Sequence, residues 1–111
     1  MVISVRGETC ADFAAIRDVI KEAFEGGKGE CEIVDKIRQS ADYYRPRLSL
    51  VAFDDIQEEE VIIGHIMLSK VQIQMNESGR KLDALALAPL SVLPNFQVRK
   101  KVHKVLVLAY Y

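Results

Sequence analysis

The sequence predicts an α/β (α+β) domain in which a mixed, mostly antiparallel sheet carries flanking helices. Three observations lead to this expectation. Apolar residues recur at helical spacing in the first third of the chain, whereas they alternate with polar residues, as in a strand, at the end of 61–75. Turn-forming residues at 76–79 then indicate a hairpin that sends the chain back antiparallel. With 111 residues, the chain is long enough for a single domain, 1–111.

The composition excludes several classes of protein. Fifteen Lys and Arg stand against 16 Asp and Glu, a net charge of -1, so the basic excess of a nucleic-acid-binding protein is absent and no nucleic-acid partner is expected. No apolar run approaches the ~20 residues of a membrane-spanning helix, and the N-terminus does not have the pattern of a signal peptide. Cys10 and Cys31 are too few and too isolated for a disulfide scaffold or a zinc site. We therefore expect a cytoplasmic protein without a metal or a membrane partner.

A strand over 2–5 is predicted to open the chain, and a helix follows it. Thr9 is a typical N-cap residue, and Asp12 stands where the carboxylate of a capping box would. Apolar residues then recur every three or four positions, which predicts a buried helix face formed by Phe13, Ile16, Val19, Ile20, Ala23 and Phe24. Gly26 and Gly27 end this helix. A second helix is expected before Pro46, and its inward stripe is Ile33, Val34 and Ile37.

The middle of the chain predicts two strands, 48–53 and 61–75, separated by an acidic loop at 54–60. His65 is expected on the same face of the second of these strands as Ile63 and Met67. The segment 82–94 carries apolar residues on both alternating faces, which is typical of a central strand covered on two sides. Pro89 lies within it and cannot donate a ladder hydrogen bond, so a bulge or a divergence from the next strand is expected there. Such a divergence opens a cleft whose free backbone groups suit a ligand with amide bonds.

In this order, the segments resemble the GNAT superfamily of acetyl-CoA-dependent N-acetyltransferases, and within it a bacterial branch of predicted N-acetyltransferases. The resemblance covers residues 1–97 and rests on Asp-Phe-Ala-Ala-Ile-Arg (12–17), Leu-Ser-Leu-Val-Ala (48–52), Ile-Gly-His-Ile (63–66) and, most specifically, Leu-Ala-Pro-Leu-Ser-Val-Leu-Pro-Asn-Phe-Gln (87–97). It implies direct transfer of acetyl from acetyl-CoA, the co-substrate, to a primary amine on a small molecule or a peptide.

The resemblance also implies where acetyl-CoA binds. Backbone groups of Leu90 and Val92, with Ser91 between them, would hold the pantetheine arm and the thioester carbonyl. The following loop would hold the pyrophosphate through Gln97, Val98, Arg99 and Lys100. The family pattern Gln/Arg-x-x-Gly-x-Gly/Ala is here Gln-Val-Arg-Lys-Lys-Val (97–102), so that lysine and valine occupy the glycine positions. A Cβ at each position is expected to hinder the approach of the backbone to an anion, while the basic residues of 99–104 still attract phosphate by charge.

Residues 98–111 are atypical of the family and allow two interpretations. Either 97–109 form the helix on the phosphate side, or 104–108 form the family's fifth strand, in which case the chain is shortened or altered after Gln97. The Val-Leu-Val-Leu composition favours the strand. In that register the resemblance implies that Tyr111, or alternatively Tyr110, is the acid that returns a proton to the departing thiolate.

His65 is the candidate general base, because a histidine titrates near neutrality. The competing interpretation is a hydrogen-bonded core histidine. Two functions therefore stay open. One is an N-acetyltransferase; the other is a degenerate GNAT-like domain without activity that serves as a binding or dimerisation module. The exposed sheet edge of so short a chain also predicts a homodimer that covers it.

Overall fold

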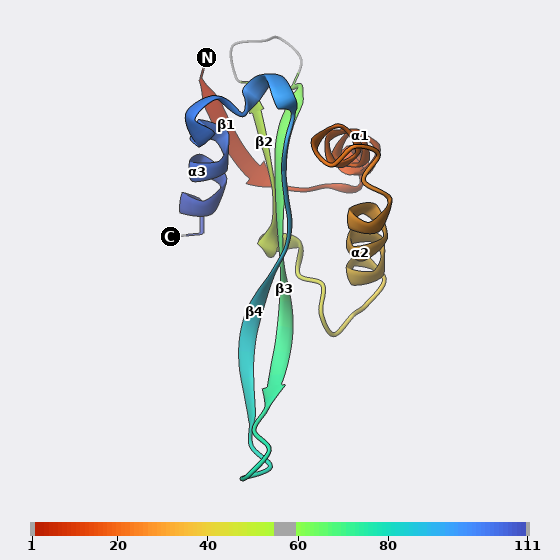
Figure 1. Ribbon diagram of the computed structural model, residues 1–111, viewed down its shortest axis with the longest axis vertical. Helices are drawn as coiled ribbons and strands as arrows, with labels where there is room; N and C mark the ends of the chain where they lie inside the picture. Colours follow the sequence, from red (N-terminus) through yellow and green to blue (C-terminus); the bar gives the residue numbers. More distant parts are fainter. Residues whose placement is uncertain (1, 55–59, 111) are drawn as a thin grey trace.

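Four strands form one antiparallel sheet in the computed structural model, which describes residues 2–54 and 60–110. Their order is β1-β2-β3-β4, with bounds Ile3–Gly7, Ser49–Asp54, Ile62–Gln74 and Lys81–Val92. Helices α1 (Phe13–Ala23) and α2 (Lys28–Arg38) cover one face, and α3 (Lys101–Leu108) covers the other (Figure 1). The predicted fold class is confirmed. The predicted acidic loop falls mostly on 55–59, outside the described residues.

Each face of the sheet has its own buried cluster. Beneath α1 and α2 this cluster consists of Ile16, Val19, Ile20, Cys31, Val34, Val51, Ile62 and Met67. Beneath α3 it consists of Leu50, Ala52, Ile63, Ile66, Val92, Val102 and Leu106. The expectation that Ile33 faces inward is wrong, since its side chain is 48% exposed. Cys31 and Val34, one helical turn apart, form the buried face of α2 instead.

The β3–β4 hairpin extends well beyond the helices, which gives the molecule extents of 53 × 28 × 24 Å (Figure 1). Gly79, at φ +67°, lies in the predicted turn. The prediction that 82–94 forms a central strand is wrong, because β4 is an edge strand of the described sheet. Because the hairpin extends beyond the helices, the apolar side chains of β4 are uncovered along most of its length: Leu82, Leu85 and Leu87 are more than half exposed. Burial is complete only at Ser91 and Val92.

The C-terminal segment is a helix, so the favoured interpretation of 104–108 as a fifth strand is wrong. Val102 and Leu106 are four residues apart and both fully buried, as expected for one face of a helix. They pack over Gly64 of β3, which has no side chain to keep the helix away. Packing therefore outweighs the strand propensity of the Val-Leu-Val-Leu run. A loop and a helix follow Gln97, as in the interpretation that placed the helix of the phosphate side at 97–109.

Candidate active site

Strand β4 changes register at Pro89, as predicted. Ile66 pairs with Leu90 and Leu68 pairs with Leu87, so that three steps along β4 match two steps along β3. The extra residue lies at Ala88–Pro89, where proline cannot contribute a ladder hydrogen bond. A bulge therefore separates the outer part of the hairpin from the short end of β4 that the sequence marks as a binding segment.

Beyond the bulge, the backbone groups of Leu90 and Val92 face the outer edge of the sheet. The N–H of Leu93 donates to the carbonyl of Ile63 on β3 at 2.9 Å. Because the direction of these groups alternates along an antiparallel strand, those of Leu90 and Val92 point away from β3. The side chain of Gln97 confirms this direction, since its Nε2 donates to the carbonyl of Val92 at 2.8 Å. No described strand lies on that side of β4.

Ser91 lies between these two residues. The side chains of Leu90 and Val92 lie beneath α3, whereas that of Ser91 lies on the face beneath α1 and α2. Its partner across the sheet is His65, and both side chains are fully buried. His65 pairs with Val51, a member of the cluster beneath α1 and α2. Ser91 Oγ and His65 Nδ1 are buried polar atoms without a hydrogen-bond partner among the described residues. The fold thus brings together two of the predicted site residues.

The prediction that Ile63 shares a face with His65 is wrong. Ile63 belongs to the cluster beneath α3, whereas Met67 lies beneath α1 and α2 as expected. The cause is a register shift between Ala52 and Phe53 of β2, opposite 62–64 of β3. Such an irregularity changes the face on which the next side chains point, and simple alternation in the sequence does not reveal it.

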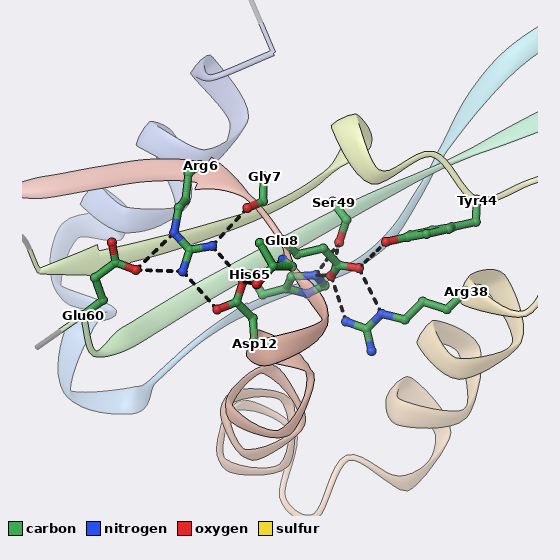
Figure 2. A network of polar contacts seen from close by, with 10 residues as sticks. Arg6, Gly7, Glu8, Asp12, Arg38, Tyr44, Ser49, Glu60 and His65 are labelled. Carbon is green, nitrogen blue, oxygen red and sulfur yellow. Dashed lines mark hydrogen bonds and ion pairs between the residues drawn. The ribbon is translucent and has the colours of Figure 1, made fainter.

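A buried carboxylate anchors the other side of His65 (Figure 2). Glu8 directly follows β1, and its side chain is fully buried. It accepts hydrogen bonds from Arg38 Nε and Nη2 at 3.1 and 2.8 Å, from Tyr44 Oη at 2.6 Å and from Ser49 Oγ at 2.5 Å. The Nε2 atom of His65 lies 2.9 Å from Ser49 Oγ and 3.4 Å from Glu8 Oε1. Polar side chains therefore run across the sheet from Glu8 to His65.

These contacts set the charge states. Burial alone would raise the pKa of the Glu8 carboxyl, but the surrounding donors outweigh burial and hold that pKa well below its ordinary value. Burial lowers the pKa of His65, and the nearby Glu8 opposes this effect only in part. Near neutral pH the pair is therefore an ionised carboxylate beside a neutral imidazole. Sequence reasoning missed Glu8, Ser49 and their partners; the signals were a charged residue just beyond the first strand and a serine within the predicted strand 48–53.

The predicted phosphate loop is a turn that leads into α3. Arg99 and Lys100 both have positive φ, 54° and 55°, and Lys100 is the N-cap of the helix. The backbone thus takes the left-handed conformation that glycine adopts without strain. Val102, at the second glycine position, turns its side chain into the core and is fully buried. An open pocket of about 410 Å³ lies beside this turn and is lined by Asn95, Phe96, Val98, Arg99 and Lys101.

The predicted acid cannot be placed, because Tyr111 lies outside the described residues. Its alternative, Tyr110, donates its hydroxyl hydrogen to the carbonyl of Leu48 at 2.8 Å. Burial raises the pKa of Tyr110 to about 12. This tyrosine therefore ties the end of α3 to the residue that directly precedes β2. The hydrogen bond to Leu48 gives Tyr110 a structural role in holding α3 in place.

In the described ranges, 2–54 and 60–110, no group of three or more His, Cys, Asp or Glu side chains is arranged to hold a metal ion. None of the helices there is long and apolar enough to cross a membrane.

Comparisons with known proteins agree with the fold and with the sequence pattern. No protein-family model and no curated protein matches the sequence. Among solved structures, a GNAT family acetyltransferase from Brucella melitensis in complex with acetyl-CoA is 32% identical, with a TM-score of 0.73 over 98% of this chain and 66% of that one. A GNAT family N-acetyltransferase from Escherichia coli in complex with CoA is 21% identical, with a TM-score of 0.67 over 96% of this chain and 53% of that one.

An aminoglycoside 6'-N-acetyltransferase from Acinetobacter baumannii has the same fold at 14% identity, with a TM-score of 0.64 over 98% of this chain and 69% of that one. The chain thus spans less than two-thirds of the Brucella and Escherichia proteins. Within that span, the strand order, the bulge in β4 and the turn before α3 occur together with 32% identity to the Brucella protein. The chain belongs to the GNAT superfamily.

Proposed function

We propose that this chain binds acetyl-CoA along the outer edge of β4 and transfers its acetyl group to a primary amine. The observation that carries the proposal is the bulge at Pro89, followed by backbone groups of Leu90 and Val92 that face away from β3. The pantetheine arm contains two amide groups, which can pair with such an edge as another strand would. The complexes of the Brucella and Escherichia proteins with acetyl-CoA and CoA support this choice of ligand.

The turn before α3 fits the phosphates in charge and in backbone shape. Arg99 and Lys100 supply positive charge at the helix N-terminus, and the uncharged Gln97 and Val98 lie on the approach to it. Val102 turns its side chain inward, so this residue leaves the outer surface of the turn free. The side chain of Lys100 stands where the family pattern has glycine. We therefore expect weak binding of the phosphates.

In the proposed reaction, acetyl-CoA supplies the activated acyl group, and the chain orients the reactants and moves protons. A neutral His65 is the proposed base, and Tyr111 is the proposed acid. Because His65 is fully buried, its action on the amine requires an intermediary. We also place the protein in the reducing cytoplasm, which is consistent with the free thiols of Cys10 and Cys31.

Calorimetric titration with acetyl-CoA, followed by mass spectrometry of reactions with a panel of primary amines, tests the proposal. We expect saturable heat with a dissociation constant in the micromolar to millimolar range and at least one acetylated amine. Titration with acetyl pantetheine, which lacks the nucleotide, is the matched control for the phosphate turn. If millimolar acetyl-CoA produces neither heat nor thermal stabilisation, the proposal is wrong.

A second candidate function is a non-catalytic module that pairs with another copy. The observation in its favour is the open edge of β4 with Leu82, Leu85 and Leu87 more than half exposed. Light scattering across a concentration series distinguishes the two. A stable homodimer that Leu85→Lys dissociates, without any acetyl-CoA binding by either form, would favour the module. A monomer that binds acetyl-CoA would favour the enzyme.

A further inference from the structure

Four polar side chains form a row beneath α1 and α2 that reaches every strand of the sheet. Glu8 directly follows β1, and Ser49, His65 and Ser91 lie on β2, β3 and β4. Each of these residues is buried. The neighbouring side chains on this face are apolar, as at Val51 and Met67. Buried polar groups cost free energy unless they are partnered, so a row of four calls for a specific role.

The hydrogen bonds decide which group donates and which accepts at each contact of the row. An ionised carboxylate has about four lone-pair sites, and Glu8 receives four hydrogen bonds. Ser49 Oγ lies 2.5 Å from Glu8 Oε1, so the serine hydrogen must lie between these two oxygens. That hydroxyl has no second hydrogen to give. Ser49 therefore accepts from His65, and the proton of the neutral imidazole is on Nε2.

The protonation state of Nδ1, the other ring nitrogen of His65, follows from this assignment. With Nε2 protonated and the ring neutral, Nδ1 has a lone pair and can only accept a hydrogen bond. Nδ1 is buried, and among the described residues it has no donor. Ser91 is directly opposite on β4, and its hydroxyl is also buried and without a partner. Residues paired in this way have Cβ atoms about 4.5–5.5 Å apart, so small adjustments bring the donor to the acceptor.

The charged groups around the imidazole agree with this assignment. Glu8 is the anion beside His65, and Arg38 of α2 is the cation that balances that anion. Tyr44, from the segment after α2, also binds Glu8 rather than His65. The Nε2 side of the ring therefore faces a fixed negative charge, whereas Ser91 on the Nδ1 side is uncharged. An imidazolium formed by proton uptake at Nδ1 would be stabilised by the Glu8 carboxylate.

We propose that Glu8, Ser49, His65 and Ser91 form a proton relay, in which Ser91 passes a proton from the acceptor amine to Nδ1 of His65 and Glu8 is a positioning residue. The relay rests on the proposed function: Ser91 is fully buried between Leu90 and Val92, so the relay requires that the amine bound at this edge open a path to the serine hydroxyl. The N–H bond of the ammonium breaks, and Ser91 Oγ takes that proton as it gives its own to Nδ1. The amine keeps the electron pair, and the imidazolium is held by Ser49 and Glu8 through Nε2–H.

The relay is tested by nitrogen-15 NMR of the His65 ring in the full chain, without any ligand. At pH 7 we expect a neutral ring with the proton on Nε2. In Ser91→Ala, the Nδ1 resonance should move toward that of an imidazole nitrogen without a hydrogen bond. The control is Ser69→Ala, which removes a buried serine of β3 on the same face as His65 and should leave the ring resonances unchanged. In Glu8→Gln the amide can donate to Ser49, so the tautomer should reverse.

The outcomes separate the relay from the proposed function. A wild-type ring protonated on Nδ1, a charged ring at pH 7, or a Ser91→Ala variant with an unmoved Nδ1 resonance would overturn the relay even if acetyl-CoA binds. Failure to bind acetyl-CoA would overturn the proposed function whatever the tautomer. With an active amine found, Ser91→Ala should lower kcat by about 10-fold or more at unchanged KM for acetyl-CoA. An unchanged kcat would contradict the relay.

Discussion

Val102 of α3 lies directly over Gly64 of β3. A Cβ built on Gly64 would lie 3.0 Å from Cγ1 of Val102, and it would also lie 3.1 Å from Cδ1 of Leu106. Such contacts are tighter than nine in ten of those that real Cβ atoms make, so the missing side chain of Gly64 allows α3 to rest on the sheet. Gly64 therefore helps to set the position of the turn that precedes α3 and of the basic residues in that turn.

Gly64→Ala is expected to destabilise the protein by about 1–3 kcal/mol, because the new methyl group forces the helix away from the sheet. Chemical denaturation measures the loss. The double variant Gly64→Ala with Val102→Ala should lose less stability than the sum of the two single variants, since the second change makes room for the first. A loss equal to that sum would show that α3 does not press on Gly64.

Replacing Arg38 is expected to be costly, because it leaves Glu8 as a buried carboxylate without its cation. Arg38→Met should reduce the free energy of unfolding by about 3–5 kcal/mol, as is typical when one partner of a buried ion pair is removed. The matched control is Arg17→Met, which removes the exposed pair of Arg17 with Asp35 and should have little effect. Similar losses in both variants would contradict the burial of the Glu8 pair.

Lys100→Gly is expected to stabilise the protein by about 1 kcal/mol, because Lys100 is held at φ 55° and glycine adopts this conformation without strain. The same change restores the family's glycine at the phosphate turn, so the affinity for acetyl-CoA should rise even though a positive charge is lost. Lys104→Gly removes the same charge from the middle of α3 and should destabilise the helix instead. A lower affinity in Lys100→Gly would show that charge outweighs backbone shape.

The stability of the protein is expected to fall as the pH drops below 6.5. Burial lowers the folded-state pKa of His65 below the ordinary value of 6.5, so the unfolded chain binds a proton that the folded chain does not. Below pH 6.5 this one group should therefore cost about 1.4 kcal/mol of stability per pH unit, down to the folded-state pKa. Thermal or urea denaturation between pH 7 and pH 5 measures the slope.

His65→Gln should remove this contribution to the slope. His103, whose pKa is also lowered by burial, contributes in the same direction, so His103→Gln is the comparison that apportions the effect. If His65→Gln retains the full slope of the wild type, the imidazole of His65 is not held neutral.

Much of the fold could be predicted because local chemistry specifies it. The apolar spacing of Phe13–Ala23 and the turn around Gly79 led to α1 and to the hairpin. The bulge followed from Pro89, whose missing N–H forbids regular pairing. Each of these features depends on residues that are close together in the sequence.

The errors arose where packing between distant segments decides the structure. The helix at 101–108 depends on Gly64, and the face on which Ile63 points depends on a register shift in β2. Glu8 gains its role only from Arg38, Tyr44 and Ser49, which lie 30 to 41 residues away in the sequence. Exposure of the apolar side chains of β4 follows from the extension of the β3–β4 hairpin beyond the helices, and no local pattern shows this.

Binding of acetyl-CoA along the outer edge of β4 is tested most directly by amide NMR of the full chain during titration with acetyl-CoA. We expect saturable shifts at the N–H groups of Leu90 and Val92 and in the turn at 97–101, while the outer hairpin at Gln72 and Asp83 stays unchanged. Shifts confined to the helices, or no shifts at millimolar acetyl-CoA, would contradict the claim.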